Sequence, residues 1–247
     1  MMPYTDIQSL MIVGLAFTIG GILKGATGVG APLVAVPMMT SFFDVKFAVA
    51  VFVLPNLIAN LLQGFMYFHA LKHKIFLLIL CLAAGVGTLL GSFILQQTSS
   101  GVLEKLMAII VLIYIGFKFF KPDWNLSMKI AQKLSFPVGF LAGFLQGAFG
   151  ISSPASFTFL NAIRFERPEF IAIVSTFFVS MSVIQLPTLT YLGLMEIEYL
   201  VIGTLAVFPL MLGMPLGALL LRNASVTLFD RVILFVLFAV AVRLLLT

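Results

Sequence analysis

Four long stretches of this chain contain no charged residue, and each is long enough to cross a lipid bilayer as a helix. They run over residues 47–68, 75–103, 170–195 and 199–221, and about 20 helical residues suffice to cross the hydrocarbon core. Inside lipid only α-helices and closed β-barrels satisfy every backbone polar group, and these stretches lack the alternation of barrel strands. Because 62% of the 247 residues are hydrophobic and only 9% are charged, we predict an all-α polytopic membrane protein.

The chain also repeats one glycine-rich pattern half a length later. Residues 21–33 read GILKGATGVGAPL and residues 143–155 read GFLQGAFGISSPA. Such duplicated, glycine-interrupted apolar segments are typical of secondary transporters, whose binding site lies where the two repeats meet. We predict a first repeat over 1–122 and a second over 123–247, integrated into one transmembrane domain. The matching residues are Gly21, Gly25, Gly28, Pro32 and Gln63 with Gly143, Gly147, Gly150, Pro154 and Gln185, and, at a slightly larger offset, Gly87 and Gly91 with Gly213 and Gly217.

Each repeat is expected to contain two short helices followed by three full spans. The short pair forms a broken-helix hairpin that returns the chain to its starting side, either by crossing twice or by re-entering. Three further spans make the number of crossings odd, so the second repeat is predicted to have inverted topology relative to the first. The predicted helices cover 7–23, 28–43, 47–69, 75–97 and 103–120, then 135–149, 151–163, 169–194, 199–221 and 227–246.

The predicted hairpin helices contain 13 to 17 residues and therefore reach only about 20–26 Å, less than a hydrocarbon core of roughly 30 Å. The junctions Gly25–Gly30 and Gly147–Ser153 are followed by Pro32 and Pro154, and proline is well placed in the first turn of a new helix. Each junction thus predicts a helix N-terminus within the membrane. Such a terminus offers free N–H groups and a positive dipole end to an anion.

The distribution of positive charge predicts the orientation in the membrane. Cytoplasmic loops of membrane proteins carry an excess of Lys and Arg, so the more basic side is assigned to the cytoplasm and both termini to the periplasm. The net charge of +5 is explained by this topology rather than by nucleic-acid binding. The cytoplasmic side would hold Lys72, Lys74, Lys121, Lys129, Lys133, Arg164, Arg167 and Arg222, and the opposite side Lys46, Lys105, Arg243 and the acidic Glu196–Glu198 loop.

The frame G-x-x-x-G-x-x-G-x-x-x-P occurs in both repeats, with Lys24 inside the first copy. This pattern, together with the duplication along the whole chain, resembles the TauE/SafE family of bacterial sulfite and organosulfonate exporters. The resemblance implies export of small sulfur-containing anions, such as sulfite or sulfoacetate, across the cytoplasmic (inner) membrane. The second repeat departs from the first at Gln146, in place of Lys24, and at Ser152–Ser153, in place of Gly30–Ala31.

Lys24 is the first candidate for an anion-binding residue. It is the only basic residue before position 40, and a cation buried within a membrane protein is costly unless it has a function. The alternative is that its side chain extends from a helix end to the lipid headgroups. Since the equivalent Gln146 is neutral, the two repeats would together provide one fixed positive charge, which suits a single anion.

The other candidates are hydroxyl, amide and backbone N–H donors near the junctions and on the following span. Asn56, Asn60 and Gln63 share one helical face, although such residues also simply connect neighbouring helices. For Gly21, Gly25, Gly143 and Gly147 close helix packing is the favoured role. The predicted substrate-binding set is Lys24, Thr27, Gly28, Gly30, Asn56, Asn60, Gln63, Gln146, Gly150, Ser152, Ser153 and Gln185.

An enzymatic function is disfavoured because an intramembrane active site needs a buried nucleophile–base pair or metal ligands, and the nine acidic residues fall in loops or near span ends. Asp44 and Glu166 are expected to pair with Lys46 or Arg164. No cofactor, metal or nucleic acid is predicted. The expected partners are the anion and the lipid bilayer, and a homodimer is compatible with the pattern. The alternatives are a transporter of another small anion or solute, or a membrane accessory subunit that transports nothing.

Overall fold

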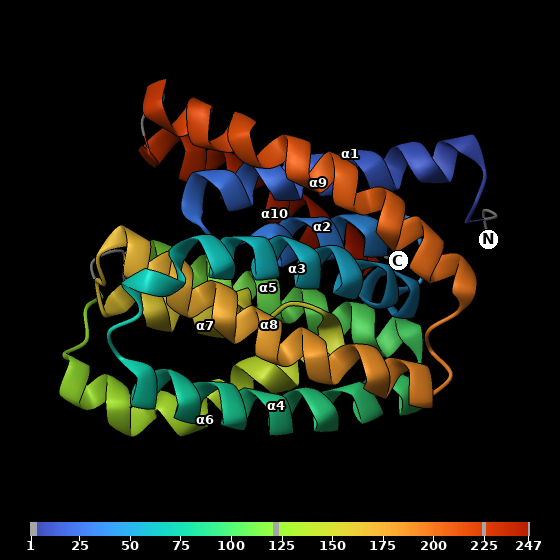
Figure 1. The fold of residues 1–247 in the computed structure, drawn as a ribbon. Coiled ribbons are helices and arrows are strands. Elements are labelled where there is room, and N and C mark those ends of the chain that lie inside the picture. Colours follow the sequence, from blue (N-terminus) through green and yellow to red (C-terminus); the bar gives the residue numbers. More distant parts are fainter. Residues whose placement is uncertain (1–3, 121–123, 224–225, 247) are drawn as a thin grey trace.

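The computed structural model describes residues 4–120, 124–223 and 226–246, which form helices joined by short loops, with no strand among them. Five of the helices are apolar and long enough to cross a membrane by length and composition, in agreement with the predicted polytopic membrane protein. Lys121 and the side chain of Arg222 lie outside the described part. The elements are α1 (Ile7–Thr27), α2 (Ala31–Thr40), α3 (Val45–Tyr67), the 3-10 turn η1 (Phe68–Ala70), α4 (Lys74–Gln97), α5 (Ser100–Phe120), α6 (Met128–Phe149), α7 (Ser153–Ala162), α8 (Arg167–Tyr191), α9 (Ile197–Asn223) and α10 (Val226–Leu246) (Figure 1).

Both predicted hairpins are interrupted at the expected glycines. Gly28 ends α1 with a left-handed φ of 82° and donates its N–H to the Lys24 carbonyl, and Gly30 precedes α2 with φ 100°. Gly150 ends α6 in the same way, with φ 69°. A residue with a Cβ is disfavoured in this conformation, so glycine permits the chain to leave each helix. The following helices, α2 and α7, have only 10 residues and carry proline in the first turn.

The first helix of each hairpin is longer than predicted. α1 continues to Thr27 and contains 21 residues, and α6 begins at Met128 and contains 22. At 1.5 Å per residue these helices reach about 32 Å, which is enough to span the hydrocarbon core. The prediction of two short segments was therefore wrong for α1 and α6 and holds for α2 and α7. The predicted bounds 7–23 and 135–149 stop short of Lys24 and Lys133, whereas the helices continue through these residues, since long cationic side chains are accommodated within a helix.

The repeated glycines bring helices from different halves into backbone contact. α1 packs along α9, and α6 packs along α4. A Cβ at Gly25 would lie 1.8 Å from the Met214 carbonyl oxygen, and one at Gly143 would lie 2.0 Å from that of Ala84. The packing role predicted for these glycines is confirmed, because any side chain would force the helices apart. Gly21, Gly147, Gly87, Gly91, Gly213 and Gly217 are equally close to a neighbouring backbone.

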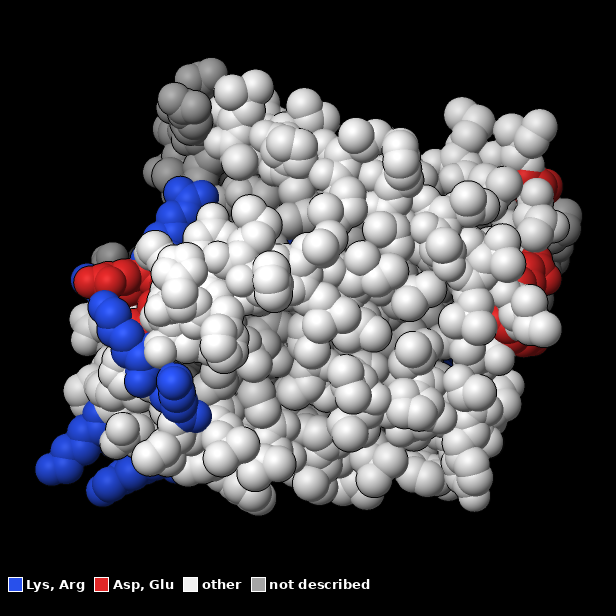
Figure 2. All heavy atoms as spheres, viewed as in Figure 1, with Lys and Arg blue, Asp and Glu red and all other residues white. Residues whose placement is uncertain are grey.

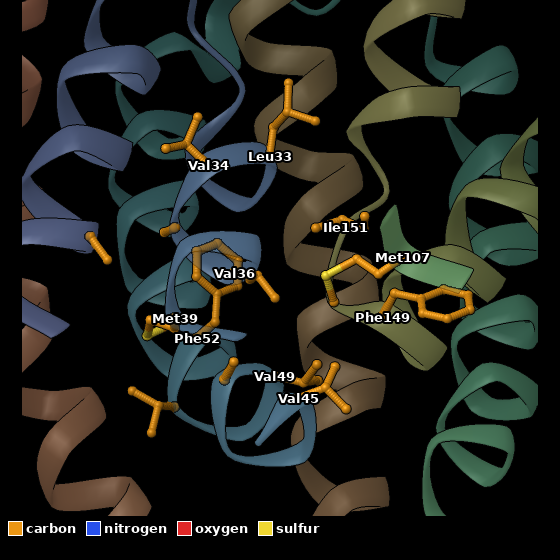
Figure 3. Close-up of a cluster of buried hydrophobic side chains, with 14 of the residues drawn as sticks. Leu33, Val34, Val36, Met39, Val45, Val49, Phe52, Met107, Phe149 and Ile151 are labelled. Carbon is orange, nitrogen blue, oxygen red and sulfur yellow. The ribbon is translucent and has the colours of Figure 1, made fainter. Parts of the chain in front are cut away.

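The two junctions pack against equivalent positions of opposite halves. A Cβ on Gly28 would lie 3.1 Å from Ile171 of α8, and one on Gly150 would lie 3.1 Å from Val49 of α3. Residue 49 plus 122 is residue 171, so these contacts follow the repeat. Around the second junction Ile151 lies among buried apolar side chains of α2, α3 and α5 (Figure 3). These contacts agree with the duplication, while the inverted orientation of the repeats stays a prediction.

Candidate functional site

Lys24 lies in the last turn of α1 and is buried, with 2% of its surface exposed. Its Nζ donates a hydrogen bond of 2.7 Å to Oδ1 of Asn60 on α3. The structure therefore directs the ammonium into the protein rather than toward lipid headgroups. Among the described residues no carboxylate forms an ion pair with it. Lys24 is thus a buried cation whose hydrogen-bond partner is neutral.

A chain of hydrogen bonds continues from Lys24 across the bundle. Asn60 donates its Nδ2 to Asn56, to the backbone carbonyl at 2.7 Å and to Oδ1 at 2.8 Å. Asn56 Nδ2 then donates to the Ser182 hydroxyl of α8 at 3.1 Å. Ser182 occupies the position in the second repeat that Asn60 occupies in the first, since 60 plus 122 is 182. We call Lys24, Asn60, Asn56 and Ser182 the lysine network; it joins α1, α3 and α8.

The second repeat contains a neutral counterpart of the Lys24–Asn60 contact. Gln146 of α6 donates its Nε2 to Oε1 of Gln185 on α8 at 3.1 Å. Gln185 in turn donates its Nε2 to the Gln146 backbone carbonyl at 2.9 Å. Both side chains are fully buried. The two repeats thus use equivalent helix pairs, α1–α3 and α6–α8, for a polar contact, but only the contact in the first repeat includes a charge.

Several buried polar atoms near these contacts have no hydrogen-bond partner among the described residues. Most buried polar groups in proteins are hydrogen-bonded, and an exception is a candidate position for a water or a ligand. Serine hydroxyls can donate to the oxygens of an anion. The atoms in this region are Oε1 of Gln63 and of Gln146 and Oγ of Ser152, Ser153 and Ser175.

The predicted binding residues do not form a single site. Thr27, Gly30 and Ser153 line a small, partly open cavity, and Lys24 is not among its lining residues. In a helix with 3.6 residues per turn, Leu23 and Thr27 lie on one face, whereas Lys24 is turned by about 100° from Leu23 and by about 60° from Thr27. Gly28 and Gly150 pack against Ile171 and Val49 instead.

The structure also reveals residues that the sequence did not identify. Tyr114 and Lys118 of α5 line the cavity, and neither belongs to a repeated motif. Lys118 resembles any loop-proximal lysine in the sequence, so no local signal marked it. Ser182 was visible only as one polar residue among several on its helix, and its contact with Asn56 depends on how α3 and α8 pack.

The expected partners of Asp44 and Glu166 were wrong. Asp44 caps α3 by accepting the backbone N–H of Lys46 at 2.6 Å, and it also accepts the Ser100 hydroxyl. The Lys46 ammonium instead contacts the Gln96 carbonyl at 3.0 Å.

Glu166 pairs with Lys72 at 2.8 Å rather than with Arg164. The hydrogen bond and charge of Lys72 lower the pKa of Glu166, and those of Glu166 raise the pKa of Lys72. This partner lies 94 residues away in the chain, which local sequence spacing does not reveal. Within the described ranges no three His, Cys, Asp or Glu side chains gather as metal ligands.

A sequence model of the family described as "Sulfite exporter TauE/SafE" matches residues 12–244 of the chain. The match covers both glycine junctions, the lysine network and the cavity. No curated protein and no solved structure matches the chain significantly.

Proposed function

The chain belongs to the TauE/SafE sulfite exporter family, and we propose that it exports sulfite or an organosulfonate such as sulfoacetate across the bacterial cytoplasmic membrane. The family is one of membrane transporters rather than enzymes, and the apolar helices make this chain a multi-pass membrane protein. The observation that supports an anionic substrate most directly is the buried Lys24 ammonium, which contacts the neutral Asn60.

The electrostatics of Lys24 favour an anion over a cation or a neutral solute. An ammonium has three N–H donors, and the structure shows one of them used, by Asn60. Removing a cation from water is costly unless a counter-charge compensates it. A sulfite or sulfonate group would supply that charge through charge-assisted hydrogen bonds, each contributing about 1.5–3 kcal/mol.

The lysine network also suggests how binding is coupled to movement. Its residues belong to α1, α3 and α8, so an anion that displaces Asn60 from Lys24 changes contacts between the two halves. We propose that the halves rock around this region and expose it alternately to either side, as in other transporters built from repeats. With the cell interior negative, export of one negative charge gains about 2.3 kcal/mol per 100 mV, which is roughly a 50-fold gradient at equilibrium.

The proposed orientation follows the surface charge. Figure 2 shows lysine and arginine side chains gathered at one end of the described molecule, at the left of the view. Red acidic side chains lie at the other end, where Figure 1 places the N-terminus, and a red group also lies among the basic side chains of the first end. The excess of basic residues supports a cytoplasmic location for the first end. Both termini are then periplasmic.

The proposal is tested by flux into reconstituted vesicles of purified protein. We expect the wild type to carry radiolabelled sulfite or sulfoacetate at a rate that responds to an imposed membrane potential. Lys24→Gln should reduce flux and anion binding by about 10- to 100-fold, as expected for loss of a charged hydrogen-bond donor, while Lys24→Arg retains the charge. Wild-type vesicles that carry none of sulfite, thiosulfate and sulfoacetate would refute export. Full flux and binding by Lys24→Gln would refute the assigned role of Lys24.

A further inference from the structure

The two repeats differ in the partner that each gives to the equivalent residue of its first helix. At the offset of 122 residues Lys24 corresponds to Gln146. At the same offset Gln63 corresponds to Gln185. Gln146 and Gln185 form two hydrogen bonds with each other, at 3.1 and 2.9 Å, whereas Lys24 donates to Asn60. The repeat therefore indicates Gln63 as a partner for Lys24, and this structure shows Lys24 on a different residue.

Gln63 has an acceptor that is not used. Its side chain is buried, with 9% of its surface exposed, and its Oε1 has no hydrogen-bond partner among the described residues. A buried acceptor without a donor carries a desolvation cost and is rare in folded proteins. This atom therefore points to a donor that reaches Gln63 in another state of the molecule.

Lys24 is close enough to supply that donor. Its ammonium has three N–H groups, and one of them is used with a described residue, Asn60. Residues three apart on a helix are neighbours on its surface, with Cβ atoms about 5–6 Å apart, so Gln63 lies next to Asn60 along α3. The flexible four-carbon stem of a lysine is long enough to carry the ammonium from one amide to the other.

The two amides connect Lys24 to different parts of the bundle. Asn60 also donates to Asn56, which reaches Ser182 of α8, so the observed contact ties α1 to α3 and α8. Gln63 lies nearer than Asn60 to the C-terminal end of α3, and the proposed orientation places that end at the cytoplasm. Transfer of the ammonium to Gln63 would therefore release the lysine network and move the charge toward the cytoplasmic side.

We propose that Gln63 is the second acceptor for the Lys24 ammonium and holds it while an anion is bound. The inference rests on the proposed export function. When sulfite or a sulfonate displaces Asn60 from Lys24, one N–H turns to Gln63 Oε1 and the others are available to the anion. Asn60 thus positions the empty ammonium and Gln63 positions the loaded one. Gln63 acts through Lys24 and is a positioning residue.

This arrangement gives the two amides opposite effects on anion affinity. Asn60 competes with the anion for the ammonium, so its contact stabilises the empty state. The contact with Gln63 forms only in the loaded state and stabilises that state. Because a ligand binds more tightly when its competent state is more populated, removal of Asn60 should strengthen binding and removal of Gln63 should weaken it.

The first test measures the Kd for sulfite in detergent-solubilised protein. Gln63→Met keeps an unbranched side chain but removes the acceptor, and it should raise the Kd by about tenfold or more, as expected for loss of a hydrogen bond to a charged group. Gln63→Asn retains an acceptor that the lysine stem can reach and should bring the Kd back to within about threefold of the wild type. Asn60→Ser, which removes the competing amide, should lower the Kd.

Gln97→Met is the matched control, because it makes the same chemical change at an exposed position at the end of α4. Its Kd should equal that of the wild type. An unchanged Kd in Gln63→Met would overturn the inference. A Kd that rises in both Gln63→Met and Asn60→Ser would also overturn it, because the two amides would then not compete.

The second test needs neither an anion nor transport. Gln63→Glu places a carboxylate where the ammonium is proposed to move, and Lys24 would provide its counter-charge. We expect the unfolding temperature in detergent to fall further for Gln63→Glu when Lys24→Gln is also present, because a buried carboxylate without a partner is strongly destabilising. The coupling should amount to about 2–4 °C or more in a protein of this size.

Gln97→Glu introduces the same charge at an exposed position, and its effect should not depend on Lys24. Additive effects of Gln63→Glu and Lys24→Gln would show that the ammonium does not reach position 63, as would a protein that fails to fold with Gln63→Glu while Lys24 is in place. Either result would overturn the second acceptor.

The two tests separate this inference from the proposed function. Wild-type sulfite flux with additive unfolding effects and an unchanged Kd in Gln63→Met would leave export intact and refute the second acceptor. Coupling between positions 24 and 63 in a protein that carries no sulfur anion would support the contact and refute the export role on which its loaded state depends.

Discussion

Lys24 Nζ and Asn60 Oδ1 lie 2.7 Å apart and connect α1 to α3 inside the protein. The contact brings a full positive charge against a neutral amide. Asn60 also donates to Asn56, so its orientation is held on both sides. The ammonium is therefore positioned but not neutralised, which is the arrangement that an anion carrier requires.

Converting this amide to a carboxylate should block transport without unfolding the protein. Asn60→Asp has nearly the same shape and would place a negative charge next to Lys24, where the anion is proposed to bind. We expect flux of sulfite and sulfoacetate to fall to background, while the thermal unfolding temperature in detergent stays the same or rises because a buried cation gains a counter-charge. Asn161→Asp makes the same chemical change at an exposed position and should leave flux unchanged. Normal flux in Asn60→Asp would contradict a role for Lys24 charge.

Adding one methyl group at the α1–α9 contact should destabilise the protein. The Cβ of Gly25→Ala would lie 1.8 Å from the Met214 carbonyl oxygen, so the two backbones have to separate. Overpacking of this kind typically costs about 1–3 kcal/mol, and thermal unfolding in detergent measures the loss. Gly116→Ala in α5 meets no atom within 4 Å and should be neutral or slightly stabilising. Equal stability of the two variants would show that the helices are not in backbone contact.

The Lys72–Glu166 ion pair connects the segment between α3 and α4 to the start of α8. We expect its contribution to the free energy of unfolding to depend on pH. Because Lys72 lowers the pKa of Glu166, the contribution of this carboxylate is complete above its ordinary pKa and is lost as pH falls through the lowered value. Because Glu166 raises the pKa of Lys72, the contribution of the ammonium is lost only as pH rises through that raised value. The pair is exposed, so its effect is small and screened by salt.

The measurement is the difference in unfolding temperature between the wild type and Lys72→Met. We expect a small difference at neutral pH that decreases in acid and in high salt. Lys74→Met is the control, since Lys74 is exposed and forms no ion pair with the described residues. A difference that grows as the carboxylate is protonated would contradict the assignment.

Thiol labelling on intact cells tests the proposed orientation. In a Cys81→Ser background, Lys129→Cys and Glu196→Cys place single thiols at positions assigned to the cytoplasm and the periplasm. A membrane-impermeant maleimide should label Glu196→Cys from outside and reach Lys129→Cys only after the membrane is opened. This result follows from the excess of Lys and Arg on the cytoplasmic side. The reverse pattern would contradict the proposed orientation of the chain in the membrane.

Several features of the fold were predictable because their causes are local. Uninterrupted apolar runs identify membrane helices, and the positions of Gly28, Pro32, Gly150 and Pro154 identify the two junctions. The limits of α1 and α6 were missed, since these helices continue through Lys24 and Lys133, beyond the predicted bounds 7–23 and 135–149. The exclusion of charge from a span is a strong tendency, but burial of Lys24 is stabilised by Asn60, 36 residues away.

The sequence alone determined that the chain is a helical membrane protein with two equivalent glycine-broken hairpins, because hydrophobic length and backbone conformational freedom depend on neighbouring residues. Only the tertiary structure decided what those hairpins contact: α9 for Gly25, α4 for Gly143, Asn60 for Lys24, and a cavity with Lys118 for Thr27. These pairings depend on how distant helices pack and on which side of a helix faces which neighbour. Residues three apart on α1, Lys24 and Thr27, consequently face different surroundings.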